Sequence, residues 1–295
     1  STMPDVQLGI RKGEQYYMRD MLYSLMLESH NDVAVAIAEH VGGSVEGFAT
    51  MMNQKAKDLG CENTNFVTPN GLDANGHYTT AVELATIASY AIKNEEFISI
   101  TNAANWTFNE ITKDRSFMVS NKDKFLYMYD GAIGVKTGFT NNAGYCFVGA
   151  VSQNGNIFVS SVLGSGWPPH RTYKWKDTCK LMDYGTDNYE KIDIFHPQTF
   201  APIYVEGGKE RIVDLYYDDE ITLLMCSDDY IKVDFCMPKK LVAAVEKNTA
   251  IGKAKYYVNN EFIKEIPILT ADKIDKIDFE FCMDEIVSLW LNKIN

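Results

Sequence analysis

The strongest constraint on the fold is a change of pattern near residue 193. Before it, segments with the apolar spacing of helices give way to short apolar strands, and a further helical segment covers residues 171–189. After it come short β-rich runs separated by Pro and Gly. Helices, then antiparallel strands, then a returning helix indicate α+β layers. We therefore predict an α+β domain over 1–192, a small all-β, sandwich-like domain over 193–275 and an amphipathic helix over 276–295.

Local signals place several element ends. A helical pattern from about residue 22 is broken at Ser29-His30-Asn31-Asp32, where Asp32 is expected to cap a second helix. Ser44 is expected to cap a third helix, and Thr80-Ala81-Val82-Glu83 has the pattern of a capping box. Asn154-Gly155 joins two apolar runs and predicts a tight hairpin, as Asn259-Asn260 does in the β-rich part.

Composition excludes several function classes. The 28 basic and 40 acidic residues give a net charge of −12, so a nucleic acid is not an expected partner. No apolar run approaches the roughly 18 residues of a membrane span. The first residues lack the features of a signal peptide, so we expect a cytoplasmic protein or a sequence that begins after processing or truncation.

The six cysteines and five histidines show no metal-binding spacing. Neither a metal site nor any other cofactor is expected. Disulfides stay possible, but Cys146 and Cys179 lie in apolar segments, where free thiols are commoner.

The first motif with chemical content is Lys136-Thr137-Gly138. On an edge strand it offers an ammonium, a hydroxyl and free backbone N–H groups to an extended anionic ligand, and Gly138 allows close approach to the backbone. The alternative is a polar strand without a role. A chance K-T-G is expected roughly 0.05–0.1 times in such a chain.

The second motif is Ser29-His30-Asn31, an S-x-N element. Ser152-Gln153-Asn154 has the same form, but it lies in the predicted hairpin, where Asn is expected for backbone reasons. The first motif interrupts an otherwise continuous helical pattern, which favours a functional role. A simple turn between two helices is the alternative.

Together these motifs resemble part of the S-x-x-K, S-x-N and K-T-G set of penicillin-recognising serine enzymes. The matching segments extend over almost the whole chain: 25–32, 70–73, 78–81, 134–140, 143–145 and Pro267. The chain thus resembles the low-molecular-mass penicillin-binding proteins, the serine-type D-alanyl-D-alanine carboxypeptidases with a C-terminal β domain. The resemblance implies a penicillin-binding/β-lactamase-like domain, incomplete at its N-terminus, and removal of terminal D-Ala from peptidoglycan stem peptides.

The resemblance also implies roles for individual residues. Ser29 would pass a proton to the leaving amine, and Asn31 would hold the acyl-side amide and the general-base lysine. Lys136 and Thr137 would bind the terminal carboxylate of the substrate, and the Phe139 N–H would form half of an oxyanion hole.

Three further residues are assigned to substrate binding: Gly138, Thr140 and Arg171. Arg171 would add positive charge near the carboxylate, although a helix-surface arginine without a role is the favoured reading. The implied partners are stem peptides ending in D-Ala-D-Ala and, as inhibitors, β-lactams. The implied location is extracytoplasmic, at the cell wall and the outer face of the cytoplasmic membrane.

One departure from the family pattern is clear. No S-x-x-K occurs, and the nearest match, Thr270-Ala271-Asp272-Lys273, lies in the predicted β domain. This chain alone is therefore expected to be inactive, with an apolar groove where the nucleophile helix would pack. A second polypeptide, an incomplete sequence or a non-catalytic wall-binding or scaffolding relative would each explain the departure.

The last segment has an apolar stripe that includes Met283, Val287 and Trp290, which is typical of an interfacial helix. Residues 272–295 carry six acids and three bases, and this net −3 opposes binding to anionic lipid. A helix docked on the β domain is the alternative to a membrane-surface helix.

Overall fold

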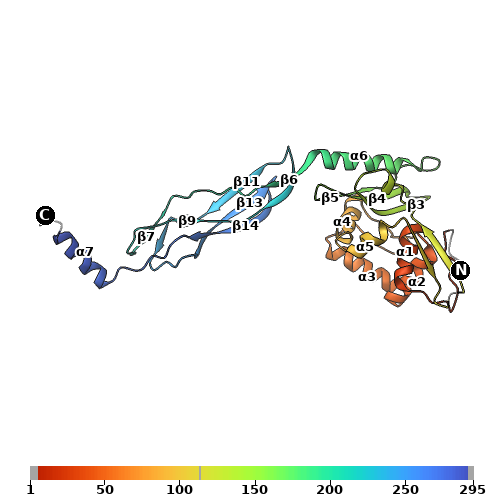
Figure 1. Cartoon of the computed structure of the whole chain (residues 1–295), viewed down its shortest axis with the longest axis horizontal. Helices are drawn as coiled ribbons and strands as arrows, with labels where there is room; N and C mark the ends of the chain where they lie inside the picture. The colour runs from red at the N-terminus through yellow and green to blue at the C-terminus, as the bar shows by residue number, and fades with distance from the viewer. Residues whose placement is uncertain (1–5, 113, 292–295) are drawn as a thin grey trace. The chain divides into compact units, whose positions relative to one another are not determined.

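The computed structural model describes residues 6–112 and 114–291. Its chain divides into two compact units, one ending at Asp187 and the other beginning at Asn188 (Figure 1). The first contains helices and antiparallel strands, and the second is almost entirely β. The α+β fold with a C-terminal β domain agrees with the prediction, while the predicted boundaries at 192 and 275 stay predictions.

The first unit begins with a helical part. Its helices are α1 (Met18–Glu28), α2 (Asn31–Gly42), α3 (Val45–Asp58), α4 (Ala81–Ala91) and α5 (Glu95–Thr101). Ser29 ends α1 in the left-handed conformation, with φ 60° and ψ 41°. Ser44 caps α3 as predicted, because its hydroxyl accepts a hydrogen bond from the Gly47 N–H at 3.0 Å.

The prediction for Asp32 was wrong. The helix begins two residues earlier than a cap at Asp32 implies, at Asn31, and His30 is in the N-cap position. The Asp32 carboxylate accepts hydrogen bonds from the backbone N–H groups of Leu8, Gly9 and Ile10 at 2.8–3.1 Å. Asp32 therefore fixes a distant segment to the start of α2.

The capping box at residues 80–83 forms only in part. The Thr80 hydroxyl accepts from the Glu83 N–H at 3.2 Å, as expected. The Glu83 carboxylate binds the backbone N–H of Asn63 and the hydroxyl of Thr64. It therefore links the start of α4 to the loop after α3.

A three-stranded antiparallel sheet forms the centre of the first unit. Its order is β3 (Ala132–Thr140), β4 (Gly144–Gln153), β5 (Asn156–Val162), so β3 lies at an edge, as the K-T-G motif requires. Asn154 and Gly155 form the predicted hairpin turn with φ of 52° and 73°.

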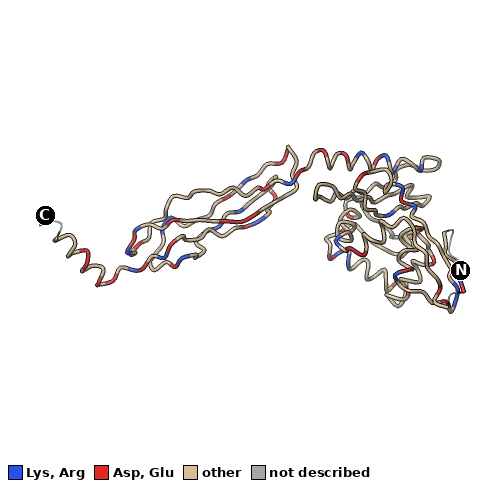
Figure 2. Tube along the Cα trace, viewed as in Figure 1, with Lys and Arg blue, Asp and Glu red and all other residues tan. Residues whose placement is uncertain are grey.

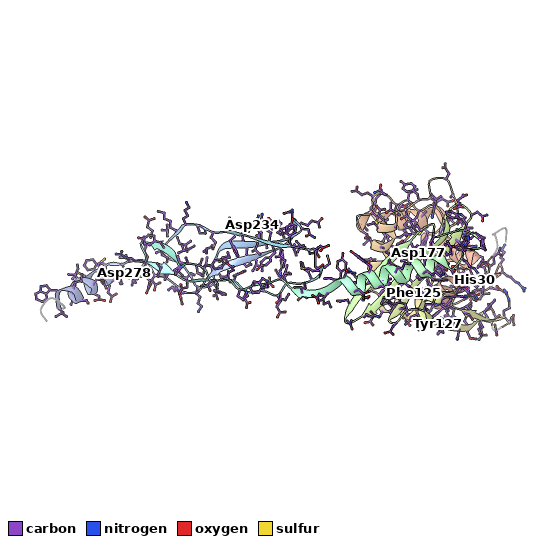
Figure 3. The ribbon with its side chains drawn as sticks, turned by 90° about the horizontal axis from the view of Figure 1, so that it is seen from above. His30, Phe125, Tyr127, Asp177, Asp234 and Asp278 are labelled. Atoms are coloured by element: carbon purple, nitrogen blue, oxygen red, sulfur yellow. The ribbon has the colours of Figure 1, made fainter. Side chains whose placement is uncertain are left out.

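Helices cover both faces of this sheet (Figure 1). On one face, Trp175 and Met182 of α6 (Tyr173–Asn188) pack with Phe147 and with Phe125 of the 3₁₀ helix η1 (Lys124–Tyr127). Figure 3 labels Phe125 beside α6. On the other face, Ile92, which follows α4, packs against the sheet in a second cluster. Successive apolar side chains of β4 point to opposite faces of the sheet, so this strand contributes to the apolar packing on both faces.

Sequence patterns did not reveal the hairpin of β1 (Asn105–Asn109) and β2 (Ser116–Ser120). It packs on α1, where Trp106 stacks on Tyr23 with ring centroids 4.0 Å apart. Its strands are short, and its core partners are remote in sequence.

The second unit is built from short strands. They are β6 (Tyr189–Asp193), β7 (Ile203–Glu206), β8 (Ile212–Val213), β9 (Leu215–Tyr216), β10 (Thr222–Cys226), β11 (Ile231–Cys236), β12 (Lys240–Val242), β13 (Ala250–Val258) and β14 (Glu261–Thr270). The largest sheet has the order β11-β13-β14-β9. Its core includes Tyr256, Ile266 and Ile268. Acidic and basic residues are mixed along these strands (Figure 2).

The last element is α7 (Phe279–Leu291). None of its residues is buried, and only Phe281 is partly covered. The Lys209 ammonium lies 5.8 Å from the centroid of the Phe281 ring and pairs with Asp278 at 2.7 Å. Within residues 6–112 and 114–291, no helix combines the length and apolar character of a membrane span.

Candidate active site

The turn between α1 and α2 carries the S-x-N motif. The Ser29 N–H donates to the Leu25 carbonyl at 2.9 Å, which closes α1 and places Ser29 at the break. Asn31 is buried at the start of α2, and its N–H donates to the Val6 carbonyl at 3.0 Å. The motif is therefore held by backbone bonds on both sides.

His30, between the two, has its ring fixed inside the protein. Its Nδ1 lies 2.7 Å from the Ser24 Oγ, and its Nε2 lies 3.3 Å from a Glu28 carboxylate oxygen. Burial lowers the pKa of His30, although the Glu28 and Asp32 carboxylates oppose this. Ser24 is fully buried, so this Ser–His–Glu group is closed to substrate. Its role is to hold the turn.

Strand β3, which carries the K-T-G motif, contacts this turn through Lys136. The Lys136 ammonium donates hydrogen bonds to the Ser29 hydroxyl and, at 3.0 Å, to the Thr137 carbonyl. Two residues 107 positions apart are thus in contact. This contact brings together the two motifs that the sequence singled out.

A buried cluster of charges accompanies Lys136. Burial lowers the pKa of Lys136 to about 8, the Lys174 ammonium adds to this by repulsion, and Asp123 opposes it. Burial also lowers the pKa of Lys174, and it raises that of Asp123 to about 6. One Asp123 oxygen accepts from the Phe125 N–H at 2.9 Å, while the buried Oδ2 has no hydrogen-bond partner. Two lysines and one carboxylate leave a surplus of positive charge, which suits an anionic ligand.

A cavity of about 470 Å³ opens at these residues. Polar groups of both motifs and several apolar side chains form its wall: Val6, Leu25, Met26, Ser29, Asn31, Pro69, Asn70, Gly71, Leu72, Lys136, Thr137, Gly138 and Phe139. Thr140, at the end of β3, donates to an Asp73 carboxylate oxygen at 2.8 Å and so fixes the strand to the loop at 69–73. The cavity thus combines a hydroxyl, an amide and an ammonium with an apolar lining.

Among the predicted site residues, Thr140 does not line the cavity itself, and neither does Arg171. Arg171 is exposed in the turn before α6 and not on the helix surface that the sequence suggested. Lys174, one helical turn further on, is only 8% exposed and lies 4.7 Å from the Trp175 ring centroid. Sequence reasoning missed Lys174, because its spacing does not distinguish it from Lys176 or Lys180 on the same helix.

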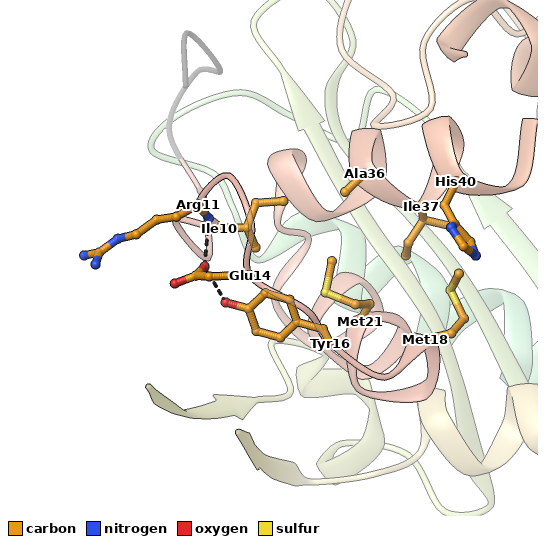
Figure 4. A pocket seen from close by; sticks show the side chains of 9 residues that line it. All are labelled: Ile10, Arg11, Glu14, Tyr16, Met18, Met21, Ala36, Ile37 and His40. Carbon is orange, nitrogen blue, oxygen red and sulfur yellow. Dashed lines mark hydrogen bonds between the residues drawn. The ribbon is translucent and has the colours of Figure 1, made fainter. Parts of the chain in front are cut away.

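A second cavity, of about 290 Å³, lies beside α1 and α2 (Figure 4). Its lining is mostly apolar: Ile10, Arg11, Glu14, Tyr16, Met18, Met21, Ala36, Ile37 and His40. At its rim, Glu14 accepts hydrogen bonds from the Arg11 N–H and the Tyr16 hydroxyl, both at 2.8 Å. It shares no lining residue with the first cavity, and the expected groove for a nucleophile helix stays a prediction.

Two other expectations concern metals and thiols. Where the chain is described, no three His, Cys, Asp or Glu side chains form a group that could hold a metal ion. All six cysteines, Cys146 and Cys179 among them, are free thiols in this structure.

Comparison with known proteins identifies the family. The family model for D-alanyl-D-alanine carboxypeptidase matches residues 3–166, more than half of the chain. The chain belongs to the D-alanyl-D-alanine carboxypeptidase family. A second family model, the C-terminal domain of penicillin-binding protein 5, matches residues 189–276 of this carboxypeptidase-family chain.

Individual relatives agree with this assignment. The chain is 29% identical over 283 residues to the D-alanyl-D-alanine carboxypeptidase DacF of Bacillus subtilis, covering 95% of this chain and 72% of that protein. The structure of penicillin binding protein 5 from Haemophilus influenzae matches with a TM-score of 0.67 and 26% identity, over 92% of this chain and 79% of the other. That of the Streptomyces K15 DD-transpeptidase matches with a TM-score of 0.58 and 33% identity, over 62% of this chain and 72% of the other.

Proposed function

We propose that the protein acts as a serine-type D-alanyl-D-alanine carboxypeptidase that removes the terminal D-Ala from peptidoglycan stem peptides through an acyl-enzyme. The contact between Lys136 and Ser29 at the wall of the 470 Å³ cavity carries this proposal. It joins the two motifs in one place, as acyl transfer with proton delivery requires. Family membership and the surplus positive charge support it.

In the proposed reaction, Lys136 and Thr137 bind the terminal carboxylate. A serine oxygen attacks the carbonyl of the penultimate D-Ala, and the Phe139 N–H helps stabilise the negative oxygen that forms. As the C–N bond breaks, Ser29 passes a proton to the leaving amine. Water then hydrolyses the ester and regenerates the serine. Asn31 holds the substrate amide on the acyl side.

The nucleophilic serine and its base lysine have no S-x-x-K counterpart among the 295 residues. We propose that they come from a segment outside this sequence. The same observation favours a second candidate function, a peptidoglycan-binding or scaffolding relative that binds stem peptides without cleaving them.

A location outside the cytoplasm, at the wall and the outer membrane face, is part of this proposal because that is where the substrate lies. A membrane-surface role for α7 is a further part. Large apolar residues of this helix are exposed, among them Phe279, Ile286 and Trp290. A helix that exposes large apolar side chains is suited to the boundary between lipid and water.

Intact-mass measurement after incubation with benzylpenicillin tests the proposal. The 295-residue chain alone should form no covalent adduct, and an adduct on one of its own serines would contradict the missing-segment proposal. With the segment restored, in one chain or as an added fragment, it should be acylated and release D-Ala. Binding of stem peptide without acylation after restoration would favour the scaffolding function.

A further inference from the structure

Aromatic side chains, most of them exposed, gather at the turn end of the β3–β4 hairpin. We call this group the aromatic ledge: Phe139, Tyr145, Trp167, His170 and Tyr173. Phe139, Trp167 and Tyr173 are 42%, 46% and 43% exposed. Phe139 is also part of the active-site cavity, so the ledge continues directly from that site.

The ledge is held in one arrangement. The Phe139 and Tyr145 ring centroids are 4.6 Å apart, and His170 stacks on Tyr173 at 4.7 Å. The Trp167 indole N–H donates to the Asn141 carbonyl at 2.8 Å. These contacts fix the rings although much of their surface faces solvent.

Two glycines make room for these rings. Gly144 has φ 70°, and a Cβ there would come within 2.9 Å of the Trp167 ring. Gly166 has φ 85°, and a Cβ there would lie 3.2 Å from His170 and Tyr173. Larger residues would displace the rings, so the local backbone is matched to the ledge.

The path of the substrate leads toward this surface. Gly134 and Val135 are buried, whereas Gly138 and Phe139 are exposed. An extended peptide anchored by its carboxylate at Lys136 and Thr137 therefore leaves along β3 toward Thr140. From Thr137 to Thr140 the strand covers about 10 Å, at about 3.3 Å per residue. A five-residue stem extends about 17 Å, so its sugar-bearing end reaches the ledge.

We propose that the aromatic ledge binds the sugar rings of the peptidoglycan glycan strand to which the stem is attached. Sugar rings have apolar C–H faces, and an aromatic ring of fixed position is a suitable surface for them. A second protein copy fits less well, because stable interfaces need about 800 Å² per partner and the ledge offers five side chains. The inference rests on the proposed function, since the stem must be bound in the cavity.

Isothermal titration calorimetry of the full chain tests this with two probes: a free stem pentapeptide ending in D-Ala-D-Ala, and the same peptide on a GlcNAc–MurNAc disaccharide. Neither experiment needs the catalytic serine. The disaccharide should improve affinity about five- to tenfold, as expected for a well-placed aromatic contact. Trp167→Ala should remove this gain and leave the affinity for the free peptide unchanged, whereas Trp167→Tyr should retain most of it.

Trp290→Ala is the matched control, because Trp290 is 68% exposed but belongs to the second unit. It should leave both affinities unchanged. Two results would contradict sugar binding by the aromatic ledge and leave the proposed function intact. One is equal affinity of the unmodified chain for both probes. The other is a Trp167→Ala variant that still binds the disaccharide-linked peptide more tightly than the free peptide. Binding of neither probe would overturn both.

Discussion

Replacing Lys136 by methionine should stabilise the first unit while removing its affinity for carboxylates. Methionine has a similar length but no charge to desolvate. Burial and Lys174 lower the pKa of Lys136 from 10.5 to about 8. One pKa unit corresponds to about 1.4 kcal/mol, so keeping this ammonium charged in the fold costs about 3 kcal/mol. The lost bonds to Ser29 and the Thr137 carbonyl offset about 1–2 kcal/mol. A net gain of about 1–2 kcal/mol at pH 7 remains.

The sign of this effect changes with pH. The folded-state pKa of Lys136, about 8, lies below the unfolded value of 10.5. The cost is therefore fully present below pH 8, decreases from pH 8 to 10.5 and is absent above. The gain in Lys136→Met should disappear over that range, leaving a small destabilisation from the lost hydrogen bonds.

Urea unfolding at pH 7 and pH 10.5, followed by circular dichroism, measures both effects. Lys176→Met is the matched control, because Lys176 is exposed on α6. It should change stability by less than about 0.5 kcal/mol at either pH. If Lys136→Met is destabilising at pH 7, or if its effect relative to the control is independent of pH, the reasoning about the buried charge is refuted.

Further predictions concern the site and the tail. Asp123→Asn removes the carboxylate that opposes the lowered pKa of Lys136, so carboxylate binding should be lost at a lower pH than in the unmodified chain; identical pH curves in calorimetry would contradict this. With the nucleophile segment restored, Ser29→Ala should slow D-Ala release by about 10²–10⁴, while Ser152→Ala, at the rival S-x-N match, should have little effect; equal rates for the two would exclude the assigned proton path. Removing residues 278–295 should abolish co-sedimentation with liposomes, and equal binding with and without them would exclude α7 as an anchor.

The sequence predicted features whose causes are local. The turn at Asn154-Gly155 and the cap at Ser44 each depend on a few neighbouring residues, and both are confirmed. The edge position of the K-T-G strand was an inference from its chemistry, and the sheet order confirms it. Backbone conformation and hydrogen bonding within a few residues determine such features, so patterns suffice.

Features that depend on remote partners could not be predicted. Asp32 has the residue type of a helix cap, but three backbone N–H groups from residues 8–10 compete for its carboxylate and bind it. Lys174 differs from Lys176 only because its side of α6 packs against the sheet. The meeting of Ser29 and Lys136 followed from a family resemblance, since a separation of 107 residues by itself indicates no contact.

The buried charges beside β3 affect which substitutions this sequence can accumulate during evolution. Lys136 and Lys174 make the folded state less stable than apolar residues of similar size would. Most random substitutions destabilise a protein, but at these positions some would be stabilising. In a lineage that no longer bound an anion there, nothing would select against such replacements, and they would accumulate. A lysine in so unfavourable a place is therefore expected to persist only in lineages where selection maintains what it binds.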